Sequence, residues 1–122
     1  MSPAPPFRVR RVYDAADPAD GVRVLVDRLW PRGLSKERAA VDEWLKDVTP
    51  SGELRSRYHR TGDHEEFAER YRAELAGPGP AAAARHLRDL ARTSTVTLVT
   101  SVKDVEHSHV PVLVEHLRTL RA

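Results

Sequence analysis

The sequence predicts a small single-domain α/β protein, with one layered sheet that is at least partly parallel and has helices flanking it. The chain of 122 residues is long enough for one hydrophobic core, and its 40% hydrophobic and 31% charged residues are typical of a globular protein. Strand patterns come first, helical patterns fill the middle, and a strand followed by a helix closes the chain. Strands joined through helices usually run parallel in one sheet, which favours the α/β class.

The chain begins with a proline-rich segment, residues 1–6, which we expect to be a flexible leader because proline lacks the backbone N–H group. The folded domain is therefore expected to span residues 7–122. In the first candidate strand, residues 7–13, arginines alternate with Phe7 and Val9. This two-residue period predicts a strand with one buried face.

A second strand is predicted at residues 22–26, where three valines and a leucine form a nearly continuous apolar run. The segment between the two strands, residues 14–21, contains a proline and a glycine and is predicted to be a loop. Residues 39–48 carry apolar side chains at helical spacing, but the segment is short and has loop signals on both sides. Its secondary structure stays open.

Three helices are predicted in the middle of the chain. Thr49 or Ser51 can cap the first, because a side-chain oxygen there accepts a hydrogen bond from a free backbone N–H group. Asp63 and Glu66 have the spacing of a capping box at the start of the second. The apolar residues of this second helix recur at every fourth position, at Phe67, Tyr71 and Leu75. A Gly-Pro-Gly-Pro segment then interrupts the pattern, and its second proline, Pro80, is predicted to open the third helix.

The clearest central strand is predicted at residues 95–101, where valines and a leucine stand among β-branched threonines. A final helix follows it. Its apolar residues have the spacing of one helical face, at Val110, Leu113, Val114, Leu117 and Leu120. We expect this face to attach the helix to the sheet.

Composition excludes several functional classes. The chain has no cysteine, which rules out disulfides, thiolate metal sites and cysteine nucleophiles. It also lacks a signal-peptide pattern and any apolar run of the ~20 residues that a membrane span needs, so we expect a cytoplasmic protein without membrane contact. The 20 basic and 18 acidic residues are mixed along the chain, which argues against a nucleic-acid partner despite a pI of about 9.3.

Polar side chains gather in two segments that each begin where a predicted strand ends. Residues 27–33 follow the strand at 22–26, and residues 101–109 follow the last strand. In open α/β sheets, ligands bind beyond the carboxyl ends of the strands. We therefore expect the two loops to form one pocket.

The first loop carries candidate ligand-binding residues. Arg28 and Arg32 offer forked, permanently charged donors that match a carboxylate or a phosphate, and Asp27 can orient them. Trp30 is the fourth candidate of this loop. The alternative is structural, with Arg28 paired to a nearby carboxylate such as Asp27 and Trp30 filling the core.

The second loop carries candidate catalytic residues. His109 is the proposed acid or base because imidazole titrates near neutral pH, with Lys103 holding an anion and Asp104 orienting the site. Ser101, which opens the loop, is expected to contact the ligand.

The two histidines of this loop allow two further interpretations. His107 and His109, with Asp104 nearby, could supply ligands to a divalent metal, although their spacing is not that of a zinc-binding helix. Alternatively, Ser108 caps the last helix and both histidines lie on the surface near its first turn.

One long string, Val-Leu-Val-Asp-Arg-Leu-Trp-Pro-Arg-Gly at residues 24–33, is specific enough to indicate a family. Shorter strings support it at residues 11–14, 20–21, 44–46, 49–51, 53–55 and 96–98. Together they make the chain resemble the YeaO-like family, a domain of unknown function numbered 488, over nearly its whole length. The family tends to have Asn-His-Ala where this chain has Ser-His-Val, so its histidine corresponds to His109. The resemblance implies a small bacterial α/β protein of the cytosol, without an established reaction.

These observations predict that the two loops bind a small anionic ligand, a phosphate or a carboxylate, while catalysis stays open. One alternative is a non-catalytic binding or regulatory module, in which the same basic groups contact a partner protein or nucleic acid. The other is a metal-assisted hydrolase that uses His107 and His109. No cofactor is predicted apart from the divalent metal of this last alternative, and the pattern leaves the oligomeric state open.

Overall fold

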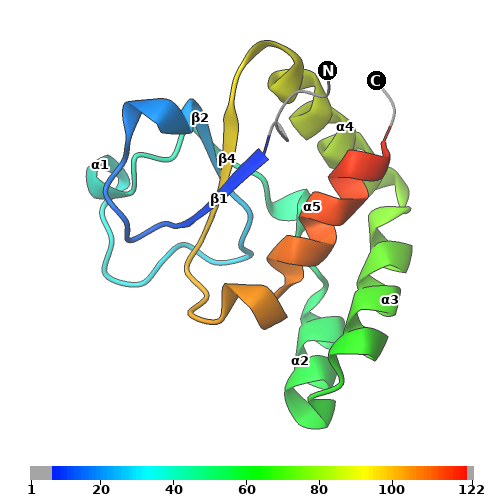
Figure 1. The fold of residues 1–122 in the computed structure, drawn as a ribbon. Coiled ribbons are helices and arrows are strands. Elements are labelled where there is room, and N and C mark those ends of the chain that lie inside the picture. The colour runs from blue at the N-terminus through cyan, green and yellow to red at the C-terminus, as the bar shows by residue number, and fades with distance from the viewer. Residues whose placement is uncertain (1–6, 121–122) are drawn as a thin grey trace.

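Four strands form one sheet in the computed structural model, which describes residues 7–120 (Figure 1). In chain order they are β1 (Phe7–Arg11), β2 (Val22–Leu25), β3 (Glu43–Trp44) and β4 (Val96–Thr100). Their order across the sheet is β1-β4-β2-β3, and each pair of neighbours is parallel. The predicted α/β class with a parallel sheet is therefore confirmed. The leader predicted at residues 1–6 lies outside the described residues.

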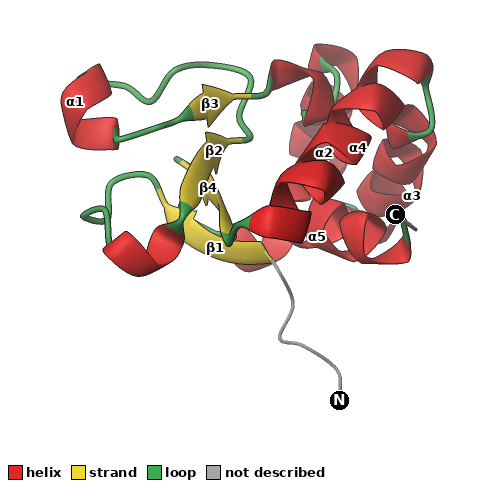
Figure 2. Ribbon diagram, turned by 90° about the horizontal axis from the view of Figure 1, so that it is seen from above, coloured by secondary structure: helices red, strands yellow, loops and turns green. Residues whose placement is uncertain are grey.

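Helices flank the sheet on both faces (Figure 2). The long ones gather on one face: α2 (Gly52–Thr61), α3 (His64–Leu75), α4 (Pro78–Thr93) and α5 (His109–Thr119). The short helix α1 (Lys36–Ala39) lies on the other face. Three single turns of 3-10 helix complete the elements: η1 (Pro18–Asp20), η2 (Lys46–Val48) and η3 (Val105–His107). No helix within residues 7–120 is long and apolar enough to cross a membrane.

The core consists of two clusters, one on each face of the sheet. The larger cluster packs residues such as Val24 and Leu98 against the four long helices. The smaller one packs Leu25 and Val99 against Ala39 of α1. All five residues of β4 are buried, because this strand lies between β1 and β2 and is covered on both faces.

The edge position of β1 corrects one prediction. Phe7 is buried as expected, but Val9 is 38% exposed, so the strand does not bury a whole face. The physical reason is that β1 ends the sheet and helix cover is incomplete at this edge. On its opposite face, Arg8 and Arg10 lie 3.5 and 3.4 Å from the buried carboxylate of Asp20.

The segment at residues 39–48, left open by the sequence, contains the short strand β3 and the turn η2. β3 pairs with β2, with Val24 opposite Glu43 and Leu25 opposite Trp44. The Nε1 atom of Trp44 donates a hydrogen bond of 2.7 Å to the backbone oxygen of Asp27. This strand therefore supports the beginning of the loop after β2.

Side-chain caps fix the starts of the helices much as predicted. Of the two candidates for α2, Ser51 is the cap, and its hydroxyl accepts from the Leu54 N–H at 3.1 Å. Asp63 caps α3 through the Glu66 N–H. Helix α4 begins at Pro78 and not at the predicted Pro80. A proline in the first turn costs no helical hydrogen bond, and Gly77 before it has the extended backbone of an N-cap residue.

Candidate functional site

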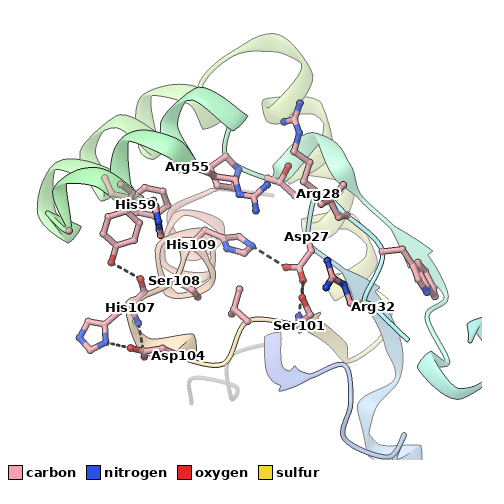
Figure 3. Close-up of a pocket in the computed structure, with 18 of the residues that line it drawn as sticks. Asp27, Arg28, Arg32, Arg55, His59, Ser101, Asp104, His107, Ser108 and His109 are labelled. Carbon is pink, nitrogen blue, oxygen red and sulfur yellow. Dashed lines mark hydrogen bonds and ion pairs between the residues drawn. The ribbon is translucent and has the colours of Figure 1, made fainter. Parts of the chain in front are cut away.

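A cavity of about 760 Å³ lies where β2 and β4 end (Figure 3). Most of its lining comes from the loop after β2, the loop after β4 and one side of α2. Predicted residues of both loops are among the lining residues: Asp27, Arg28, Trp30, Arg32, Ser101, Asp104, His107 and His109. The two loops therefore line one cavity because β2 and β4 are adjacent and parallel, so that both carboxyl ends reach the same edge.

Asp27 ties the two loops together. Its carboxylate accepts hydrogen bonds from the hydroxyl of Thr100 at 2.7 Å, from the backbone N–H of Ser101 at 2.7 Å and from the hydroxyl of Ser101 at 2.9 Å. The residue is only 7% exposed. One carboxylate oxygen thus accepts from the last residue of β4 and the other from the first residue of the loop after it, so Asp27 holds the start of that loop in place.

His109 stands in the first turn of α5, beside Asp27. Its Nε2 atom lies 2.7 Å from the backbone oxygen of Val26 and 3.5 Å from a carboxylate oxygen of Asp27. A carbonyl oxygen only accepts, so Nε2 carries the proton and donates it. Burial has the largest effect on the pKa of His109 and lowers it. The hydrogen bond to Val26 and the charge of Asp27 raise this pKa by less, and the charge of Arg55 lowers it further. The ring is therefore neutral at pH 7.

The environment of His109 also tests the alternative in which His107 and His109 both lie on the surface. Ser108 does cap α5, since its hydroxyl accepts from the Val110 N–H. His109, however, is buried, and only His107 is exposed. The surface interpretation is therefore wrong for His109.

Three arginines line the cavity without an ion-pair partner in the described part of the chain: Arg28, Arg32 and Arg55. The alternative in which Arg28 pairs with Asp27 is therefore wrong, because Asp27 is turned towards Thr100, Ser101 and His109. In Figure 3, Arg32 and Arg55 extend towards the Asp27–His109 pair from opposite sides. The guanidinium group of Arg28 lies farther out, at the rim.

Helix α2 supplies site residues that the sequence prediction missed. Arg55, Tyr58, His59 and Gly62 all line the cavity, and their i, i+3, i+4, i+7 spacing places them on one side of the helix. The Tyr58 hydroxyl donates to the backbone oxygen of His107 at 2.8 Å, which links α2 to the loop after β4. Their spacing in the sequence indicates one side of a helix, but it does not show that this side faces the two loops.

The other predicted residues have mixed placements. Lys103 is exposed and is not a lining residue of the cavity. Asp104 pairs with His107 at 2.9 Å, on the exposed rim. Trp30 packs against the smaller core cluster, as its structural alternative predicts, and its Nε1 atom donates to the backbone oxygen of Leu34 at 2.7 Å. It also lines the cavity, and its contact with a ligand stays a prediction. Its ring also packs edge-on against Trp44.

The geometry gives no support to a metal centre at His107 and His109. Within residues 7–120, no group of three or more histidines, aspartates and glutamates is placed to hold a metal ion. His107 is engaged with Asp104, and the Nε2 of His109 with the backbone of Val26.

Comparisons with known proteins agree on one family. A family model described as the inactive DUF488-N3 subclade matches residues 6–121. The uncharacterized protein YeaO of Escherichia coli is 46% identical over 115 residues, which cover 93% of this chain and 98% of that protein. The uncharacterized proteins Mb3100c of Mycobacterium bovis and Rv3073c of Mycobacterium tuberculosis are each 49% identical over 111 residues, covering 90% of this chain and 92% of each relative. No solved structure matches the chain. The chain thus belongs to the DUF488 family, within its inactive N3 subclade.

Proposed function

We propose that the cavity binds a small organic anion and that the protein acts by binding it, without catalysing a reaction. One observation carries this proposal: arginines that form no ion pair within residues 7–120 line a cavity whose one buried carboxylate is already occupied. A guanidinium group matches a carboxylate or a phosphate through two parallel hydrogen bonds.

The arrangement of Ser101, Asp27 and His109 favours binding over catalysis. A serine nucleophile is usually activated by a histidine that accepts its hydroxyl proton, because a carboxylate is too weak a base for this at neutral pH. Here the Ser101 hydroxyl donates to Asp27, and His109 uses its Nε2 proton on the Val26 carbonyl. The histidine is thus placed to support the loop and not to activate the serine, which agrees with the description of the matching family model as inactive.

The conservative substitution Arg32→Lys tests the proposal, because it keeps the positive charge but removes the forked guanidinium group that can form two parallel hydrogen bonds. Thermal unfolding would be followed with and without inorganic phosphate, acetate, citrate and benzoate. We expect a saturable rise in the Tm of the parent protein with at least one anion, since a ligand that binds only the native state stabilises it. Arg32→Lys should keep the basal Tm and lose most of that rise.

Arg60→Lys is the matched control, because Arg60 lies on α2 but is exposed and does not line the cavity. It should respond to anions as the parent does. The proposal fails if no anion stabilises the parent, or if Arg32→Lys lowers only the basal Tm. Tight, strongly salt-dependent binding of unrelated nucleic acids would instead support the alternative of a nucleic-acid-binding module.

A further inference from the structure

We infer that the ligand is a phosphate monoester carrying a planar ring, with its phosphoryl group between Arg32 and Arg55 and its ring against Tyr58. This inference rests on the proposed function and specifies its ligand. Three properties of the cavity lead to it: an excess of positive charge, an aromatic side chain one helical turn from an arginine, and a volume larger than a bare anion needs.

The charges on the cavity wall favour a dianion. Three arginines, Arg28, Arg32 and Arg55, outnumber the two carboxylates of the lining, Asp27 and Asp104, and Asp104 lies on the exposed rim. Asp27 is itself turned towards the donors of Thr100 and Ser101. A monocarboxylate carries one negative charge, whereas a phosphate monoester carries about −1.5 to −2 at pH 7 and offers three acceptor oxygens. The phosphate is the better match to three arginines.

Helix α2 places an aromatic ring beside the expected position of the phosphate. Tyr58 follows Arg55 by three residues, which corresponds to roughly 4.5 Å along the helix axis on the same side. Both side chains line the same cavity. A ligand whose phosphate is held by Arg55 can therefore direct its ring towards Tyr58.

The Tyr58 ring is held in position before any ligand arrives. It stacks on Phe67 with 4.5 Å between ring centroids and an interplanar angle of 19°. Its hydroxyl is bonded to the backbone oxygen of His107. Because Tyr58 also lines the cavity, the part of the ring that Phe67 does not cover is left for contact with a ligand. A ring that is already fixed loses little conformational entropy when a planar group packs against it.

The size and lining of the cavity agree with this ligand class. Its volume of about 760 Å³ falls within the range of roughly 300–1,000 Å³ that is typical of small-molecule pockets. The lining also has an apolar part, to which Leu29, Trp30 and Pro50 contribute. An inorganic phosphate would leave this part of the wall without contact.

Four probes separate the phosphate from the ring by isothermal titration calorimetry. Phenyl phosphate has both features, methyl phosphate has the dianion without the ring, benzoate has the ring with one charge, and methyl phenyl phosphate has the ring with a singly charged phosphodiester. We expect phenyl phosphate to bind most tightly, about fivefold or more above methyl phosphate because of the aromatic contact. Benzoate and methyl phenyl phosphate should bind about tenfold more weakly than phenyl phosphate, because each lacks the second charge.

Two variants of Tyr58 test its part in this preference. Tyr58→Phe keeps the ring and should keep the preference for phenyl over methyl phosphate. Tyr58→Leu should bind both phosphates equally, at the affinity of the parent for methyl phosphate. If Tyr58→Leu does not fold, the comparison of the four probes on the parent protein decides alone.

The outcomes distinguish this inference from the function on which it rests. If phenyl phosphate binds no more tightly than methyl phosphate, the ring contact is wrong while anion binding stands. If benzoate binds as tightly as phenyl phosphate, the inferred preference for a doubly charged ligand is wrong. If none of the four probes binds, the inference and the proposed function both fail.

Discussion

Asp27 is the residue on which the shape of the cavity depends most. It accepts three hydrogen bonds from Thr100 and Ser101, and its own backbone oxygen accepts the Trp44 side chain. These contacts join β2, β3 and β4 at the edge where the cavity opens. At the residue scale, a carboxylate that the sequence predicts to be a ligand contact thus serves first to hold the structure together.

The substitution Asp27→Ala should therefore destabilise the fold itself. It leaves the buried hydroxyl of Thr100 and the N–H of Ser101 without an acceptor, and each unsatisfied buried donor costs about 1–3 kcal/mol. We expect the free energy of unfolding in urea to fall by about 2–4 kcal/mol. Asp104→Ala, which removes an exposed carboxylate, should change it by less than about 1 kcal/mol. Equal losses in the two variants would contradict the assigned role of Asp27.

His109 makes the stability depend on pH. Burial holds its pKa in the folded protein below the ordinary 6.5, so in weak acid the unfolded chain binds more protons than the folded one. The stabilisation of the fold by the neutral His109 ring is therefore complete above about pH 6.5. It is lost as the pH falls from there through the pKa that His109 has in the folded protein. The free energy of unfolding should decrease between pH 7 and pH 5.

The variant His109→Gln isolates this effect, because glutamine does not titrate and can still donate to the Val26 carbonyl. The pKa of His116 is also lowered by burial, but His116 is present in both proteins and its effect cancels in the difference. The parent should lose more stability than His109→Gln over this pH range. Parallel curves for the two proteins would show that His109 is not the buried neutral group described above.

At the scale of elements, α5 positions one side of the cavity through its packing. Its face of Val110, Leu113, Val114 and Leu117 is buried in the larger core cluster, where α5 packs against α3 and α4. Ser108 and His109 at its start line the cavity. Leu117→Ala should therefore lower the free energy of unfolding by about 2–5 kcal/mol, as truncation of a fully buried leucine usually does. Chemical denaturation measures the loss, with the exposed neighbour Arg118→Ala as the control. A loss no greater than that of Arg118→Ala would mean that α5 does not dock as the structure places it.

At the scale of the whole molecule, the sheet and the edge that carries the cavity could be predicted from the sequence. Two apolar strands were each followed by polar loops, and parallel pairing is enough to bring Asp27, Ser101 and His109 together. Two features escaped prediction for physical reasons. A strand of two residues, β3, is too short to show a period, and its place depends on pairing with β2. The side of α2 that meets the sheet edge depends on tertiary packing, so Arg55 and Tyr58 were missed, while Lys103, close to the strand end in sequence, does not line the cavity.

The central claim is that Arg32 and Arg55 together hold an anion in this cavity. The most direct measurement follows the side-chain Nε–H signals of the arginines by NMR while inorganic phosphate is added to the ¹⁵N-labelled protein. If the account is correct, the signals of Arg32 and Arg55 shift and saturate with a common Kd, while the signal of the exposed Arg60 on the same helix as Arg55 does not move. Signals of Arg32 and Arg55 that stay unchanged, or that shift only as much as Arg60 does and without saturation, would contradict it.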